Sequence, residues 1–159
     1  MAYVTGSKRS SGCVFCIPAQ PDRAEDEQRH IVYRGAHAFI ILNLYPYNPG
    51  HLLIAPYRHT ADLESLTAGE SAEMMALAQQ ALRALRTDTG PQGYNMGMNL
   101  GSVGGAGIAD HLHLHLVPRW EGDTNFMPVI GGTKVLPELL TATAARLRQR
   151  LAEVEEAGE

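Results

Sequence analysis

Residues 111–116 read His-Leu-His-Leu-His-Leu, and this strict alternation constrains the fold more than any other stretch of the chain. Side chains alternate between the two faces of a strand, so His111, His113 and His115 are expected on one face and the leucines on the other. The leucines then pack into a core, whereas the imidazoles line a cleft. The chain therefore needs a sheet that is covered on one face and partly open on the other.

Four further segments supply the strands that such a sheet needs. Apolar, β-branched and aromatic residues gather in short runs bounded by turn residues, which is the pattern of strands joined by turns. The first two runs are separated only by a short turn with a glycine and predict a hairpin. The predicted strands are 31–35, 37–45, 51–57, 93–101 and, for the histidine row, 111–117.

Two other segments carry apolar residues at helical spacing. The first begins at Thr67, which can form a capping box with Glu70, and ends before Gly90. The second runs from Pro137 to about Val154 along an apolar stripe. The order of elements predicts an α+β fold, with a five-stranded antiparallel sheet, a central helix and a C-terminal helix. Helix is expected to cover one face of the sheet.

Composition narrows the class of protein. With 159 residues, 45% of them apolar and 19% charged, the chain is long enough for one globular domain with a sizeable core. A net charge of -4 gives no basic face for polymeric nucleic acid, and the apolar runs are too short to cross a bilayer. The N-terminal stretch has no apolar secretory segment, so we expect a cytoplasmic protein that does not bind membranes.

Histidines on one strand face allow different kinds of chemistry. Imidazole is a common zinc ligand, and a metal-dependent hydrolase could use the row itself as its ligand set. Same-face neighbours are about 6.5–7 Å apart, however, so three rings converge on one ion only with difficulty. Alternatively, one neutral histidine attacks an electrophilic phosphorus while another donates a hydrogen bond. Incidental histidines on a half-exposed strand are the third possibility.

A glycine-rich loop at 99–110 directly precedes the row. Glycines let backbone N–H groups approach an anion, so such a loop can form a phosphate-binding nest. The chain has neither a P-loop nor a Rossmann fingerprint. A glycine-rich loop next to a histidine strand favours phosphate chemistry.

The row and two other blocks resemble one known family. Residues 111–117, HLHLHLV, match the signature of the histidine triad (HIT) superfamily of nucleotidyl hydrolases and transferases. Residues 42–59, LNLYPYNPGHLLIAPYRH, are similar to the family's nucleoside-binding hairpin. Residues 93–101, GYNMGMNLG, are similar to the strand that feeds its active-site loop. The resemblance covers roughly residues 13–137 and implies a HIT-like fold.

The resemblance implies an enzyme that cleaves nucleotide phosphoanhydrides through a covalent nucleotidyl-histidine. His113 corresponds to the nucleophile that attacks the α-phosphorus, and His115 to the histidine that donates to the phosphate. His111 completes the catalytic row, and no catalytic metal is required. The resemblance also implies six nucleotide-binding positions: Asn43, His51, Asn99, Ser102, Gly107 and Trp120.

The pair Cys13 and Cys16 gives a second candidate site. The CxxC spacing suits metal or redox chemistry, and a redox pair would want a thioredoxin-like context that this chain lacks. Zinc needs two more ligands. Several HIT branches hold a structural zinc with a CxxC, a histidine after the third strand and the first histidine of the row, which implies His59 and His111 here. A cysteine pair without metal is the alternative.

This zinc would join two parts of the chain. Residues 1–30, which carry the CxxC, are predicted to belong to the same domain as the HIT domain at 31–159. HIT proteins usually pair through their helix and an edge strand. The resemblance therefore implies a homodimer or a larger homo-oligomer.

One position departs from the family. Most members carry a glutamine four residues before the row, where this chain has Gly107. The loop without this glutamine most resembles the diadenosine tetraphosphate phosphorylase-like branch. The function implied is phosphorolysis of diadenosine tetraphosphate to ADP and ATP, with inorganic phosphate as the second substrate. Two alternatives are hydrolysis of dinucleoside polyphosphates or nucleoside phosphoramidates, and nucleotide binding without catalysis.

Overall fold

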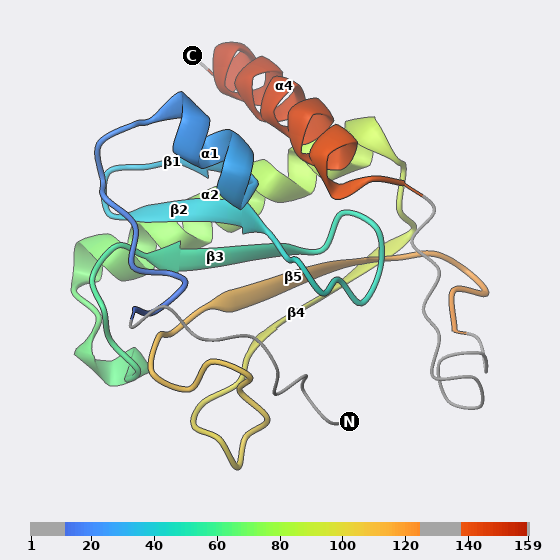
Figure 1. The fold of residues 1–159 in the computed structure, drawn as a ribbon. Coiled ribbons are helices and arrows are strands. Elements are labelled where there is room, and N and C mark those ends of the chain that lie inside the picture. The colour runs from blue at the N-terminus through green and yellow to red at the C-terminus, as the bar shows by residue number, and fades with distance from the viewer. Residues whose placement is uncertain (1–11, 125–137, 159) are drawn as a thin grey trace.

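Five strands form one antiparallel sheet in the order β1-β2-β3-β5-β4 (Figure 1). The computed structural model describes residues 12–124 and 138–158. The predicted α+β fold with a five-stranded antiparallel sheet is confirmed. The strands are β1 (Ile31–Arg34), β2 (Ala38–Leu42), β3 (Leu52–Pro56), β4 (Gly93–Met98) and β5 (Leu114–Arg119).

Two long helices pack against the sheet (Figure 1). α2 spans Ala68–Asp88 and α4 spans Leu140–Gly158. α2 begins as predicted, because Thr67 Oγ1 accepts from the N–H of Glu70 while the Glu70 carboxylate accepts from the N–H of Thr67. The predicted start of the second helix, Pro137, lies outside the described residues.

The main core lies between these helices and the sheet. Leu114 and Leu116 of β5 are buried on this face, as the alternation predicts. Burial of a leucine side chain contributes about 1.5–3 kcal/mol, which fixes β5 with its histidine face turned the other way. The core neighbours come from β2, β3, α2 and α4 and include Ile40, Leu52, Ile54, Leu77, Leu85, Leu147 and Leu151.

The opposite face of the sheet is covered in part by the N-terminal segment. Phe15 and Ile17 of this segment are buried on that face, and residues 1–11 lie outside the described part. The apolar cluster on this face contains Phe15, Ile17, Ile31, Phe39, Ile41, Leu53 and Ala55.

Two short helices were not predicted from the sequence. α1 spans Arg23–Arg29, and a 3-10 helix, η1, spans Leu63–Ser65. α1 has no buried residue, so no apolar spacing marks it. Its signal is the N-cap, because the Asp22 carboxylate accepts from the N–H groups of Ala24 and Glu25.

The histidine row is not one regular strand. β5 begins at Leu114, so the first three residues of the row precede it, and the strand continues to Arg119. The N–H of Leu112 donates instead to the carbonyl of Thr60 (2.6 Å). The predicted strand over 111–117 is therefore wrong at its start. This irregular beginning lets the first histidine face a different set of partners from the other two.

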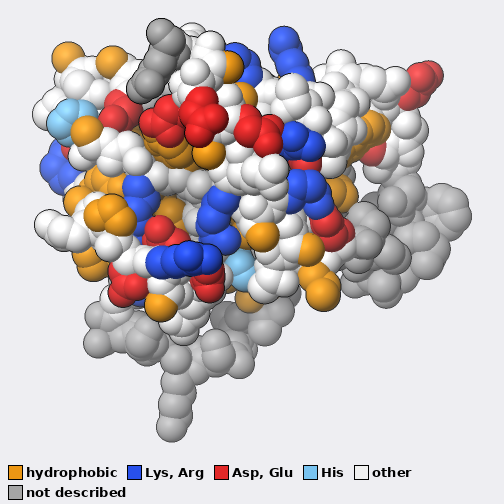
Figure 2. Space-filling view, turned by 90° about the horizontal axis from the view of Figure 1, so that it is seen from above, with side chains coloured by type: hydrophobic (Ala, Val, Ile, Leu, Met, Phe, Trp, Pro, Cys, Tyr) orange, Lys and Arg blue, Asp and Glu red, His pale blue; other side chains and the backbone are white. Residues whose placement is uncertain are grey.

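Among the described residues, no helix combines the length and the apolar character needed to cross a membrane. Acidic and basic side chains are interspersed on the face of the molecule that carries α1 and α4 (Figure 2). An ion pair joins α1 to β1, where Arg34 lies 2.8 Å from Asp26.

Candidate active site

His113, the nucleophile predicted from the sequence, is buried at 5% exposure. Its Nδ1 lies 2.8 Å from the carbonyl oxygen of His111, which can only accept, so Nδ1 carries the proton and donates. The neutral ring then has an unprotonated Nε2. Burial lowers the pKa of His113, which keeps the ring neutral near pH 7. Nε2 can therefore act as a nucleophile without a separate base.

A chain of hydrogen bonds fixes the proton of His115. The backbone N–H of Tyr47 donates to Nδ1 of His51 (3.0 Å), so the proton of His51 sits on Nε2. That Nε2 donates to Nδ1 of His115 (3.0 Å). Burial and then the charge of His113 lower the pKa of His115 to about 4, so the ring is neutral near pH 7. His115 consequently carries its proton on Nε2, as a hydrogen-bond donor.

Asn43 lies beside this chain of hydrogen bonds. It follows β2, and its Nδ2 lies 3.3 Å from Nδ1 of His51. Its Oδ1 accepts from the N–H of Tyr45 (3.0 Å). The backbone N–H of Asn43 also donates to the carbonyl of His51 (2.9 Å). The structure thus brings two of the predicted nucleotide-binding residues, Asn43 and His51, together with His115.

These bonds do not suit a metal site built from the row itself. Nε2 of His113 is unprotonated, but Nε2 of His115 carries a proton and Nε2 of His111 is bonded to the carbonyl of Pro56. Nδ1 of His111 faces the two cysteines. The three rings are therefore directed at three different partners.

The second predicted cluster does converge. Nδ1 of His111 lies 3.4 Å from Sγ of Cys13 and 3.9 Å from Sγ of Cys16. Nδ1 of His59 lies 3.3 Å from Sγ of Cys16. All four ligand atoms lie within 4.8 Å of one another. Ligand atoms around a tetrahedral zinc with bonds of about 2.0–2.3 Å are about 3.3–3.8 Å apart, so the geometry and the donor set fit this ion.

His111 links this cluster to the nucleophile. Its Nε2 donates to the carbonyl of Pro56 (2.9 Å), which leaves Nδ1 unprotonated and able to bind a metal. The backbone carbonyl of His111 accepts a hydrogen bond from Nδ1–H of His113. Phe15, between the two cysteines, packs on the ring of His113, with centroids 4.9 Å apart. His113 is therefore held by one backbone bond from His111 and by one ring contact from the CxxC segment.

The glycine-rich loop follows β4 and leads into the row. Asn99 Nδ2 donates to a carbonyl within this loop (3.4 Å). Gly104 has no room for a side chain, because a Cβ there would lie 2.4 Å from the carbonyl oxygen of Leu100. Ser102 and Gly107 are exposed in the same loop. Both positions are therefore accessible to a ligand.

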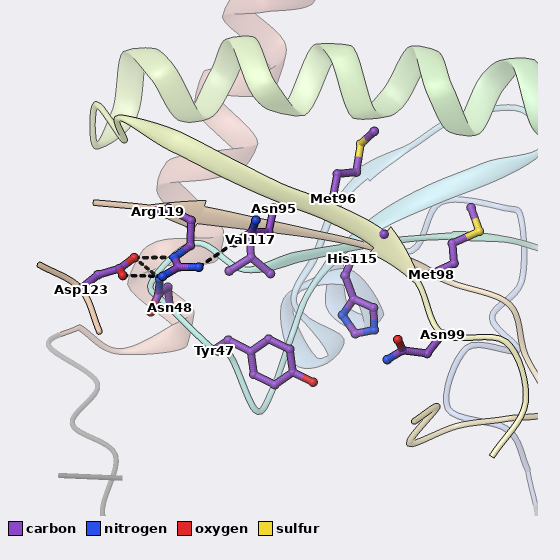
Figure 3. A pocket seen from close by; sticks show the side chains of 11 residues that line it. Tyr47, Asn48, Asn95, Met96, Met98, Asn99, His115, Val117, Arg119 and Asp123 are labelled. Carbon is purple, nitrogen blue, oxygen red and sulfur yellow. Dashed lines mark hydrogen bonds and ion pairs between the residues drawn. The ribbon is translucent and has the colours of Figure 1, made fainter. Parts of the chain in front are cut away.

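A cavity of about 460 Å³ opens beside His115 (Figure 3). Small-molecule sites usually have about 300–1,000 Å³, so this volume suits a ligand. The side chains of Met96 and Met98 point away from Tyr47, so these two residues contribute mainly backbone (Figure 3). The lining residues are Tyr47, Asn48, Asn95, Met96, Gly97, Met98, Asn99, His115, Val117, Arg119 and Asp123.

An ion pair closes the end of this cavity farthest from His115 (Figure 3). Arg119 donates to both carboxylate oxygens of Asp123 at 2.7 Å and to Oδ1 of Asn95 at 2.6 Å. Nδ2 of Asn48 donates to Asp123 as well (2.8 Å). The guanidinium holds the pKa of the Asp123 carboxyl well below its usual range. This end of the cavity is polar but has little net charge.

The sequence predicted a cleft beside the histidines and named two of its lining residues, Asn99 and His115, but most of the other lining residues were missed. Tyr47 and Asn95 lie in separate segments, and only the alternation that continues along β5 to Arg119 could have indicated a lining. Trp120 lies outside the lining, and its indole N–H donates to the carbonyl of Thr89 (3.4 Å) at the end of α2. The role of Trp120 in nucleotide binding stays a prediction.

Comparisons with known proteins agree with this geometry. Residues 24–122 match the model of the HIT domain family. The AP-4-A phosphorylase of Mycobacterium tuberculosis is 51% identical over 130 residues, which cover 79% of this chain and 67% of that protein. An uncharacterized HIT-like protein of Methanocaldococcus jannaschii is 30% identical over 117 residues, 70% of this chain and 81% of that protein.

The fold also resembles solved structures. A Zn-bound histidine triad family protein from Mycobacterium smegmatis superposes with a TM-score of 0.72 and 30% identity, over 91% of this chain and 96% of that one. A diadenosine triphosphate hydrolase from Plasmodium falciparum gives a TM-score of 0.65 at 15% identity, over 83% of this chain and 80% of that one. At this identity the second likeness concerns the fold alone.

Proposed function

The chain belongs to the HIT domain family, and we propose that it is a phosphorylase that converts diadenosine tetraphosphate and inorganic phosphate into ATP and ADP. The 51% identity to a mycobacterial AP-4-A phosphorylase supports this substrate. The prediction of an enzyme that cleaves nucleotide phosphoanhydrides agrees with both comparisons. The observation that carries the mechanism is the bond from Nδ1 of His113 to a backbone carbonyl, because it leaves Nε2 free to attack.

The reaction takes place in two displacements. Nε2 of His113 attacks the α-phosphorus and forms a P–N bond, while the bond to the bridging oxygen breaks and its electron pair leaves with ATP. A phosphate oxygen then attacks the same phosphorus, ADP forms, and the electron pair of the P–N bond returns to Nε2. The carbonyl of His111 accepts from Nδ1–H throughout and stabilises the positive charge on the substituted ring.

His115 donates a hydrogen bond to an oxygen of the phosphate that is attacked. Its Nε2–H is fixed by the bonds from Tyr47 through His51, so no reorganisation is needed when charge develops on the phosphate oxygens. Asn43 for the ribose, and Asn99, Ser102 and Gly107 of the loop for the phosphates, complete the proposed contacts. None of these steps requires a catalytic metal.

We further propose that zinc is bound by Cys13, Cys16, His59 and His111 and has a structural role. The four converging ligand atoms support this, as does the likeness to a Zn-bound HIT protein. The ion would hold the N-terminal segment against the sheet and keep the carbonyl of His111 in place. A homodimer or larger assembly and a cytoplasmic location remain predictions.

A product assay tests the function. The protein is incubated with diadenosine tetraphosphate with and without ¹⁸O-labelled inorganic phosphate. The nucleotides are then separated, and their masses are measured by mass spectrometry. We expect ADP that carries the label together with ATP, at a rate that rises with phosphate concentration. Release of AMP and ATP at the same rate with or without phosphate would show that the protein is a hydrolase and not a phosphorylase. Binding without turnover or adduct would leave only a nucleotide-binding protein.

A further inference from the structure

The catalytic histidines have different surroundings on their two sides. In the sheet, β5 lies between β3 and β4. Asn43 lies beyond β3, at the end of β2, whereas Asn95 and Gly97 belong to β4. The cavity occupies the β4 side of His115. His115 therefore has this cavity on its β4 side, whereas Asn43 does not line the cavity.

We propose that the cavity between Tyr47 and β4 is the leaving-group site. It holds the nucleoside polyphosphate that departs in the first step and then the inorganic phosphate that accepts the adenylyl group. This inference rests on the proposed function and adds the place where the second half of the substrate binds. The retained nucleotide would lie on the side of Asn43.

The geometry of phosphoryl transfer requires one compartment for both groups. The attacking and leaving atoms lie roughly in line through the phosphorus, so the leaving group departs on the side opposite His113. The acceptor phosphate must later attack opposite the P–N bond, which is the same side. A cavity that admits the leaving nucleotide therefore also guides the acceptor.

The polarity of the cavity changes along its length in a way that suits this occupant. At one end His115 offers an Nε2–H donor, and Asn99 lies nearby (Figure 3). At the other end, four residues further along β5 or about 13 Å, the ion pair of Arg119 and Asp123 has little net charge. Phosphates fit the first end, and the uncharged hydroxyls and base of a nucleoside fit the second.

Gly97 controls the space in front of His115. The two residues are paired across the β4–β5 ladder, where side chains on one face have Cβ atoms about 4.5–5.5 Å apart. A Cβ at Gly97 would meet no atom within 4 Å, so a larger residue fits the protein but fills the cavity. Gly93 has the same open surroundings on the same strand, and it does not line the cavity.

The experiment compares Gly97→Val with the matched control Gly93→Val. Valine favours strands, and both positions lie on the same edge strand, so effects on folding or on strand pairing are shared. Each variant and the wild type are assayed with diadenosine tetraphosphate and with adenosine 5′-phosphorofluoridate, whose leaving group is only fluoride. Formation of the adenylyl-protein is followed by mass spectrometry in both cases.

We expect Gly97→Val to lower kcat/KM for diadenosine tetraphosphate at least tenfold and to change that for the fluoridate less than twofold. Gly93→Val should stay within twofold of wild type on both substrates. An equal loss on both substrates, or no loss on either, would overturn the leaving-group site. If the wild type forms no adduct with either substrate, the proposed function itself fails.

The second step provides an independent arm. Adenylyl-protein is prepared from the fluoridate and then mixed with inorganic phosphate. Attack by phosphate gives ADP and attack by water gives AMP, so the fraction of ADP measures how well phosphate enters the cavity. The Gly97→Val variant should form several-fold less ADP and more AMP than Gly93→Val. An unchanged ratio of ADP to AMP would show that the acceptor phosphate does not bind in this cavity.

Discussion

The two ends of the histidine row show how one residue type serves two purposes. At His111 the ring is fully buried, its Nε2 is bonded to a carbonyl, and its Nδ1 faces two cysteines. At His115 the ring borders a cavity, its Nδ1 is bonded to His51, and its Nε2 carries a donor proton. One end faces a closed cluster of side chains that could bind a metal, and the other end faces an open cavity.

The difference arises from the partner of the second ring nitrogen. In His111 the bond from Nε2 to a carbonyl leaves Nδ1 unprotonated and able to bind a metal, and in His113 the bond from Nδ1 to a carbonyl leaves Nε2 unprotonated and able to attack phosphorus. In His115, Nδ1 accepts from the Nε2–H of His51, so the proton of His115 is on Nε2, which is a donor. The surrounding backbone and His51, rather than the histidines themselves, assign the three roles. Each prediction below separates these roles.

The largest effect is expected at the residue between the two ends. His113→Ala should reduce turnover of diadenosine tetraphosphate by about 10⁴-fold or more, because no other group supplies the covalent step. The adenylyl-protein should disappear from mass spectra. Zinc content, measured by atomic emission, should remain at the wild-type level, because His113 is not a ligand. Full activity in this variant would end the proposed mechanism.

Replacing one of the proposed zinc ligands tests the cluster at His111. Cys16→Ser should lose zinc and lower the melting temperature by about 5 °C or more, because a structural zinc site contributes several kcal/mol to folding. A brief exposure of the wild type to chelator should leave initial activity intact, with loss appearing only as the protein unfolds. Immediate loss of activity, reversed at once by zinc, would instead indicate a metal that takes part in the reaction.

A smaller effect is expected from breaking the chain of hydrogen bonds at the open end. His51→Phe removes the donor to Nδ1 of His115 while keeping a ring, and should lower kcat by about 10- to 100-fold. The adduct on His113 should still form. ¹⁵N NMR should show that His115 no longer holds a single tautomer, a change that a packing role for His51 does not predict. Wild-type kcat with a scrambled tautomer would contradict this assignment.

The smallest effect is a pH dependence of stability. The pKa of His115 is about 4 in the folded protein and 6.5 in the unfolded chain, so the unfolded state binds protons first as pH falls. Its contribution to stability is complete above about pH 6.5 and is lost between pH 6.5 and 4, on the order of 3 kcal/mol. His115→Gln, which can accept and donate but does not titrate, should lose less free energy of unfolding over this range. Denaturant titrations with zinc present measure both.

The fold could be predicted because its signals are local. The alternation at 111–116 and the capping box at Thr67 each act within a few residues, and both predicted a feature that the structure contains. α1 was not predicted, because none of its side chains is buried and no apolar spacing marks it. The start of β5 was misplaced because a bond from Leu112 to Thr60, far away in the sequence, replaces the ladder.

The site could be predicted less completely. The resemblance marked His51 as a nucleotide-binding position, but its bond to His115 joins residues 64 positions apart and has no local pattern. The cavity combines Asn48 with Asn95, which only the register of β4 on β5 brings together. Long-range pairing of this kind is decided by packing of the whole sheet, which the spacing of residues along the chain does not encode.

The position of β4 at the edge of the sheet has a consequence for how this enzyme can change. The nucleophile and its supporting bonds belong to the interior strands β3 and β5 and to the segments that lead into them, whereas Asn95 and Gly97 line the cavity from the outermost strand. With the proposed leaving-group site, substitutions on the cavity-facing side of β4 should alter which second nucleotide is accepted while the chemistry at His113 stays intact. A library confined to this one strand would then change substrate range separately from reactivity.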